Sequence, residues 1–87
     1  MKEILINCAK IESMGQIHDT LARELNFPVW YGRNLDALHD CLTAIGEQTQ
    51  ITFLHFSSLP FSSRGLLRVL RDSENENPNL EISLVTN

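Results

Sequence analysis

An α/β fold is predicted for this chain: a small three-stranded parallel sheet in strand order 1-2-3, with three to four helices packed against it. Short apolar runs typical of strands lie at residues 3–7, 51–56 and 80–85, and segments with helical periodicity separate them. Strands joined through helices run parallel, and short right-handed crossovers leave consecutive strands as neighbours. The 87 residues suffice for one domain, which we expect over residues 1–87.

The first helix is predicted between two clear signals. Ser13 and Gln16 have the spacing of a capping box. The apolar residues that follow recur at helical spacing: Met14, Ile17, Leu21 and Leu25. Phe27-Pro28 ends the helix, because proline lacks the donor that a further turn needs and restricts the residue before it. His18 is expected on the surface of this helix.

A second helix is predicted from about Leu35 to Ile45. Asn34 is a good N-cap for it, and Gly46 follows the last turn, where a positive φ is favourable. The apolar residues expected to face the core form one stripe: Leu35, Leu38, Leu42 and Ile45. Gly32, in the loop before the helix, is expected to supply unusual backbone angles or a close approach of the chain.

The second half of the chain repeats the pattern of strand, helix and strand. Residues 51–56 are so continuously apolar that we expect them in the buried centre of the sheet, with His55 in the strand. Ser62 or Ser63 caps a third helix, which is expected to end near Ser73. A polar loop then leads into the last strand.

Charge and composition narrow the class of partner. Seven basic and eleven acidic residues give a formal net charge of −4. This excess of acid argues against nucleic acid, because phosphate binding needs a basic surface, and favours a basic protein. The sequence shows neither a signal peptide nor an apolar run of ~20 residues, so we expect a cytoplasmic protein without membrane contact. Cys8 and Cys41 are then expected as reduced thiols.

The second helix also predicts the functional surface. Four polar residues fall at i, i+3, i+4 and i+7, on a face that points away from the leucines: Asp36, His39, Asp40 and Thr43. Asp40 stands out, because aspartate has a poor helix propensity in the middle of a helix. On these residues alone, an ordinary solvated face and a binding surface for a cationic partner both remain open.

The segment from Trp30 to Thr43 resembles the signature segment of the barstar family, the intracellular inhibitors of barnase-type ribonucleases. The order of strands and helices is similar along nearly the whole chain. The resemblance implies an inhibitor, not an enzyme, which is a monomer when free and binds one small basic ribonuclease, of a secreted or toxin type, in a 1:1 complex. It also implies that Asp40 enters the active site of the nuclease as a mimic of an RNA phosphate.

Other residues of this surface follow from the same resemblance. The residues expected to contact the partner are Trp30, Asn34, Leu35, Asp36, His39, Asp40, Thr43, Asp72 and Glu76. Trp30 either packs on the first helix or stands exposed beside the carboxylates as an aromatic anchor. Arg33, His39 and Ile45 depart from the family pattern. These departures keep a second hypothesis open, in which the chain is an immunity or adaptor module for a toxin that is not a ribonuclease.

Catalytic and metal sites are weak alternatives. His39, Asp40 and Cys41 are neighbours in sequence, but their side chains diverge around a helix and cannot meet as a triad. Asp36, His39 and Asp40 share one face, yet no second cluster at ligand spacing completes a metal shell. We therefore predict no catalytic residue, no metal and no cofactor.

Overall fold

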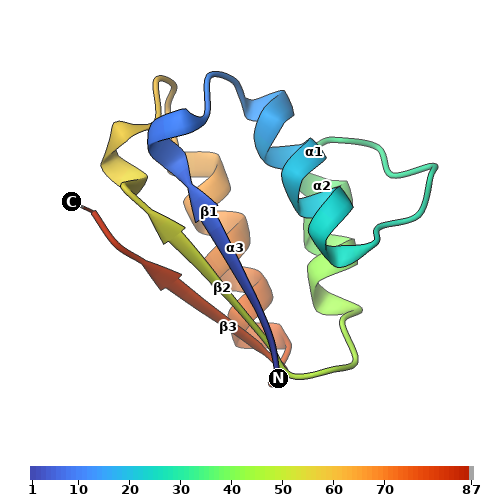
Figure 1. The fold of residues 1–87 in the computed structure, drawn as a ribbon. Coiled ribbons are helices and arrows are strands. Elements are labelled where there is room, and N and C mark those ends of the chain that lie inside the picture. The colour runs from blue at the N-terminus through green and yellow to red at the C-terminus, as the bar shows by residue number, and fades with distance from the viewer. Residues whose placement is uncertain (87) are drawn as a thin grey trace.

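A computed structural model describes residues 1–86, which form one three-stranded parallel sheet and three α-helices. The strands are β1 (Lys2–Asn7), β2 (Thr49–Leu54) and β3 (Leu80–Leu84), in the order β1-β2-β3 (Figure 1). The central strand β2 pairs with both neighbours in parallel, and its Ile51 lies opposite isoleucines in β1 and β3. The predicted fold class and strand order are confirmed.

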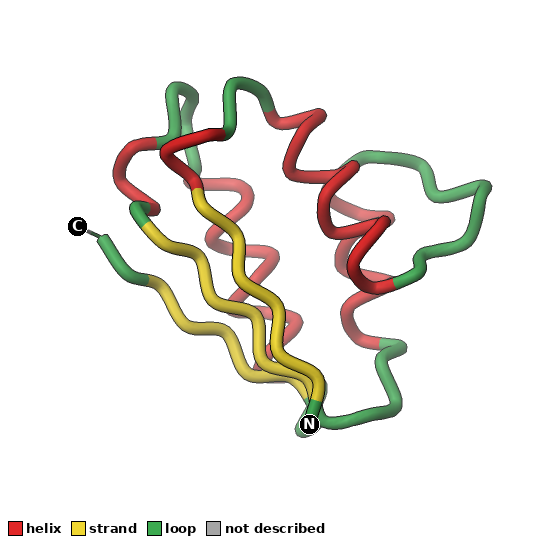
Figure 2. The backbone as a smooth tube through the Cα atoms, viewed as in Figure 1, coloured by secondary structure: helices red, strands yellow, loops and turns green. Residues whose placement is uncertain are grey.

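The helices α1 (Met14–Leu25), α2 (Leu35–Thr43) and α3 (Arg64–Glu76) cover one face of the sheet (Figures 1 and 2). Two short 3-10 turns, η1 (Cys8–Lys10) and η2 (Phe56–Ser58), follow the first two strands. Both crossovers step across the sheet in the same direction, and right-handed connections therefore place all helices on the same side. The result is a two-layer structure whose outer sheet face is open to solvent.

β2 is the central strand as predicted, but helices cover only one of its two faces, so the strand is not buried throughout. The strand begins at Thr49, two residues earlier than expected, and buries Ile51 and Phe53 while Thr52 and Leu54 remain half-exposed. Both edges of β2 are paired with neighbouring strands. On the face that carries Thr52 and Leu54, however, no helix within residues 1–86 covers the strand. His55 lies just outside the strand, in a left-handed conformation with φ 55°, and not within it as predicted.

The helix ends predicted for α1 and α3 can be compared with those in the structure. Ser13 caps α1, because its Oγ accepts a hydrogen bond from the Gln16 amide at 3.3 Å. Asn26 ends the helix in a left-handed conformation with φ 56°. The third helix does not end near Ser73, which is fully buried, but continues to Glu76. It begins after Ser63, which makes no side-chain capping bond.

The end of α2 differs from the prediction for a physical reason. The helix ends at Thr43, and Gly46 does not adopt a positive φ. The buried Asn77 instead caps the helix from the far end of α3, because its Nδ2 donates to the carbonyl oxygens of Leu42 at 2.9 Å and of Ile45 at 3.0 Å. An amide from a distant segment thus satisfies carbonyl groups that a glycine turn would otherwise satisfy locally.

Candidate functional site

The solvent face of α2 carries the predicted carboxylates. Asp36 is exposed in the first turn, where a negative charge is favourable to the helix dipole. The Asp40 side chain is 86% exposed, in the middle of the helix. Asn34 caps the helix through Oδ1, which accepts from the Ala37 amide at 2.8 Å. Thr43 donates its hydroxyl proton to the His39 carbonyl at 2.8 Å, so this side chain bends back onto the helix.

His39 connects this face to the end of α3. Its Nε2 hydrogen-bonds to Oε2 of Glu76, and its Nδ1 lies 3.9 Å from Oδ1 of Asp40. The pKa of His39 is raised chiefly by the hydrogen bond to Glu76; desolvation, the next largest cause, opposes the shift, and the charges of Glu76, Asp40 and Asp72 add to it. Asp36, on the same face of α2, is not among the groups that cause the shift in the pKa of His39.

The packing of α2 against α3 thus brings together four predicted acidic residues. We call Asp36, Asp40, Asp72 and Glu76 the acidic face. All four are exposed. Leu35, the remaining predicted contact residue of α2, is half-buried and packs against the core at the helix start. A surface of this kind attracts and orients a cationic partner, and it offers no arranged nucleophile or base.

The loop between α1 and α2 lies next to this face and presents two apolar side chains to solvent. Val29 is 101% exposed and Trp30 is 81% exposed. Of the two interpretations of Trp30, packing on α1 is therefore wrong. The backbone turn that carries them is closed by the Tyr31 amide, which donates to the Pro28 carbonyl at 2.9 Å.

Of the two roles expected for Gly32, the structure shows the close approach of the chain and not the unusual backbone angles. Arg33, not the glycine, has the left-handed backbone, with φ 52°, and no glycine in residues 1–86 has a positive φ. Gly32 allows a close approach, since a Cβ there would lie 3.0 Å from the side-chain Nδ2 of Asn34. The Arg33 guanidinium turns toward α1, with Nε 2.9 Å from Oδ1 of Asp19. Its charge is thus partly offset and directed away from the acidic face.

Sequence reasoning missed the contact that holds Tyr31. His18 is not a surface residue as predicted, because it is only 4% exposed and its Nδ1 hydrogen-bonds to the Tyr31 hydroxyl at 2.6 Å. A signal was present, since Met14, His18, Leu21 and Leu25 also recur at the spacing of one helical stripe. A histidine within an apolar stripe is expected to be buried with a polar partner.

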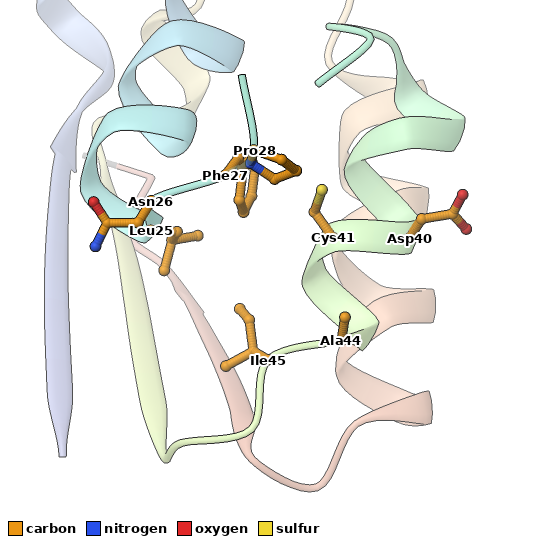
Figure 3. Close-up of a pocket in the computed structure, with 8 residues that line it drawn as sticks. All are labelled: Leu25, Asn26, Phe27, Pro28, Asp40, Cys41, Ala44 and Ile45. Carbon is orange, nitrogen blue, oxygen red and sulfur yellow. The ribbon is translucent and has the colours of Figure 1, made fainter. Parts of the chain in front are cut away.

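The other flank of α2 forms an apolar groove of about 330 Å³ against the end of α1. Figure 3 shows Cys41 and Ile45 turned toward this groove, whereas the Asp40 carboxylate points away from it, on the opposite flank of the helix. Asp40 still lines the groove through the rest of the residue, together with Leu25, Asn26, Phe27, Pro28 and Ala44. A smaller depression of about 200 Å³ is lined by both Trp30 and Asp40, so the exposed loop and α2 form one continuous surface.

The features of other site classes are not found in the part of the chain that the structure describes. Among residues 1–86 no three His, Cys, Asp or Glu side chains are grouped to hold a metal ion. No helix within these residues has the length and apolar character needed to cross a membrane. Cys8 is buried and Cys41 is half-buried, both are free thiols, and burial raises the pKa of each.

Comparison with known proteins agrees with this architecture, a small α/β protein with an exposed acidic helix. The sequence model of the family described as Barstar (barnase inhibitor) matches residues 1–85. A Bacillus subtilis (strain 168) protein named "Putative ribonuclease inhibitor YrdF" is 51% identical over 43 residues, which are 49% of this chain and 47% of that protein. The match thus spans about half the length of this curated relative. Because the family match covers nearly the whole chain, the chain belongs to the barstar family.

Proposed function

We propose that this protein inhibits a small basic ribonuclease by placing the acidic face over the active site of the enzyme. The observation that carries this proposal is the position of Asp40, which is 86% exposed in the centre of a helix that the core holds rigidly from behind. Family membership supplies the class of partner, since the matching family is described as barnase inhibitor.

Asp40 acts as a mimic of an RNA phosphate. An active site that binds RNA phosphates presents several cationic donors, and a carboxylate that enters it forms charge-assisted hydrogen bonds with them. Binding removes water from these pairs, which makes each of them stronger than in the free proteins. The side chain needs no conformational change for this role, because it already projects from α2 into solvent.

The surrounding residues assist in two ways. Asp36, Asp72 and Glu76 extend the negative field and steer a basic enzyme toward Asp40, which raises the association rate at low ionic strength. Trp30 covers the edge of the contact as an aromatic anchor. The complex is 1:1, and the inhibitor, monomeric when free, acts in the cytoplasm.

Inhibition of RNA cleavage by barnase, used as a probe ribonuclease, tests this proposal. Wild type should inhibit in proportion to its concentration, and Asp40→Ala should inhibit at least ~100-fold less well. Glu3→Ala is the matched control, because it removes the same charge from an exposed position on β1, away from the acidic face. Equal loss in both variants would mean that net charge, and not this face, carries the effect.

A second outcome of the same test concerns the type of partner. If folded wild type neither inhibits barnase nor retains a ribonuclease from lysate of the source cells, ribonuclease inhibition is contradicted. The departures at Arg33, His39 and Ile45 favour a toxin of different chemistry in that case. Retention of a basic nuclease that Asp40→Ala fails to retain supports the proposal.

A further inference from the structure

A buried histidine and a half-buried tyrosine form a hydrogen-bonded pair behind the exposed loop. The loop from Phe27 to Arg33 presents Trp30 to solvent, and Tyr31, the next residue, points the other way and reaches His18 of α1. The loop contains neither a helix nor a strand. The side chains of Val29 and Trp30 are exposed and therefore contribute little to holding it in place. Its position on α1 therefore depends on the residues that flank the exposed pair.

The Tyr31 side chain contacts both α1 and Phe27. Its hydroxyl lies 2.6 Å from Nδ1 of His18, and the two ring centroids are 5.7 Å apart. On its other side the Tyr31 ring packs against Phe27, at a centroid separation of 4.9 Å and an interplanar angle of 59°. This tilted arrangement is favourable for aromatic pairs. The tyrosine is thus fixed both at its ring and at its hydroxyl group.

Both partners are neutral near pH 7. Burial and the nearby Arg33 lower the pKa of His18, against the smaller opposite effect of Asp19. Burial is also the main cause that raises the pKa of Tyr31 to about 12, with Cys41 adding to the shift and Arg33 opposing it. A hydrogen bond between neutral groups is not screened by salt as an ion pair is, and removal of the Tyr31 hydroxyl leaves the buried His18 without this partner.

A second attachment lies beside the first but is weaker. Asp19, the residue after His18, pairs with Arg33 at 2.9 Å, and both side chains are more than half exposed. Exposed ion pairs contribute little and are screened by salt. The loop is also joined to α1 by the Arg33 guanidinium, which donates to the Gly15 carbonyl at 3.3 Å, and by the Phe27 amide, which donates to the Ala22 carbonyl at 2.9 Å. Among the side-chain attachments of the loop, the His18–Tyr31 contact is the one least exposed to solvent.

We propose that His18 and Tyr31 are a positioning pair, which holds the loop on α1 so that Trp30 stands beside Asp40 of α2. The loop and the helix already share one depression, lined by both Trp30 and Asp40. For partner binding this inference rests on the proposed function. The effect on the loop itself does not, and it is measurable in the free protein.

The pair acts by keeping the loop in its binding conformation before the partner arrives. When only a fraction of molecules has the competent conformation, the apparent affinity falls by that fraction. The loss appears in the association rate, because molecules with a misplaced loop do not form the complex. Dissociation is unchanged, since Tyr31 itself is turned away from the partner and the contacts of Trp30 and Asp40 are intact once bound.

Tyr31→Phe is the variant that tests this inference with the least disturbance, because it keeps the ring on Phe27 and removes only the hydroxyl group. Thr49→Val is the matched control. It removes the buried hydroxyl group that donates to the Glu47 carbonyl at 3.0 Å, far from the loop in the fold. Urea melts of both variants show whether the two lose similar global stability.

Fluorescence anisotropy decay reports on the loop directly, because Trp30 is the only tryptophan in the chain. We expect a larger fast component in Tyr31→Phe than in wild type, with Thr49→Val unchanged. An identical decay in Tyr31→Phe and wild type would overturn the inference. An equal increase in both variants would overturn it too, because the loop would then respond to general loss of stability.

Binding kinetics with barnase test the consequence. Tyr31→Phe should associate more slowly, by up to about tenfold, the limit that corresponds to one lost part-buried hydrogen bond, with a dissociation rate within about twofold of wild type. Faster dissociation with unchanged association would contradict the positioning role. If wild type binds neither barnase nor a ribonuclease from lysate of the source cells, the proposed function is contradicted instead, and the anisotropy still decides whether the pair holds the loop.

Discussion

The two faces of α2 differ in almost every physical property although they belong to the same nine-residue helix. Leu38 and Leu42 on the inner face are fully buried, whereas Asp36 and Asp40 on the outer face are exposed. The inner face therefore contributes to folding through burial, and the outer face contributes little to it. The difference indicates that the outer face, the proposed binding surface, can change without a change in the core.

What separates the two faces is the way in which α2 is held. The leucines anchor the helix from behind, Asn34 caps its start, and Asn77 satisfies the carbonyl groups at its end. None of these contacts involves Asp40. A rigid helix held in this manner presents its outer side chains in fixed positions, which lowers the entropic cost of binding.

The largest expected effect is a loss of binding affinity caused by a substitution on the outer face of α2. Asp40→Ala should weaken binding to the ribonuclease by at least ~3 kcal/mol, as expected for loss of one member of a buried charge pair. Its free energy of unfolding should change by no more than about 1 kcal/mol, because the side chain is exposed in the free protein. Isothermal titration and a urea melt of the same variant measure the two quantities.

The barnase and barstar complex is itself the reference case for an anchor of this kind, so the size of this effect follows from family membership and not from the geometry. The geometry supplies the separation between binding and folding. A variant that unfolds, or one that binds as wild type does, would show that the outer face of α2 is not the inhibitory surface.

A substitution on the inner face should lower the stability of the fold and leave binding nearly unchanged. Leu42→Ala should lower the free energy of unfolding by about 2–5 kcal/mol, because it removes a fully buried side chain and leaves a cavity. At temperatures where the variant is still folded, its affinity for the ribonuclease should stay close to that of wild type. Calorimetric unfolding and titration test this, and a large loss of affinity in the folded variant would mean that the two faces are coupled.

The sequence predicted the fold well because its signals are local. The capping box at Ser13, the proline after Phe27 and the cap at Asn34 each act within a few residues, and all three place helix ends correctly. The end of α2 could not be predicted in this way. It depends on Asn77, which lies 35 residues from Leu42 in the sequence.

The site shows the same division between local and distant causes. The exposure of Asp40 followed from helical periodicity, since the leucine stripe fixes which face is buried. The bond of His39 to Glu76 and that of His18 to Tyr31 join segments 37 and 13 residues apart. Such pairs arise from tertiary packing, which periodicity within one segment does not report.

A smaller effect is expected at the buried side of α3. The hydroxyl oxygen of Ser73 is buried and has no hydrogen-bond partner within residues 1–86. Ser73→Ala should therefore raise the free energy of unfolding by about 1 kcal/mol, through relief of the unsatisfied group and better helix propensity. Asn75→Ala, at an exposed position of the same helix, gains only the propensity. Equal gains in urea melts of the two variants would contradict the role of burial.

The smallest expected effect is a pH-dependent change in stability at the His39–Glu76 pair, which joins α2 and α3 at the edge of the acidic face. The pKa of His39 is raised in the folded protein, chiefly by Glu76. A raised pKa means that the pair stabilises the fold below the ordinary histidine value of about 6.5 and that this contribution is lost as the pH rises through the shifted pKa. Relative to His39→Gln, wild type should thus gain stability in acid, as measured by urea midpoints between about pH 5 and 8.

Binding should change in the opposite direction over the same pH range. Protonation places a positive charge beside Asp40 and engages Glu76, which weakens the attraction for a cationic partner. Wild type should therefore lose affinity in acid, beginning above about pH 6.5, while His39→Gln loses less. Histidines of the partner titrate equally with both variants, so only the difference between the two curves belongs to His39. Parallel curves would show that this residue stabilises the helix pair without contributing to the binding surface.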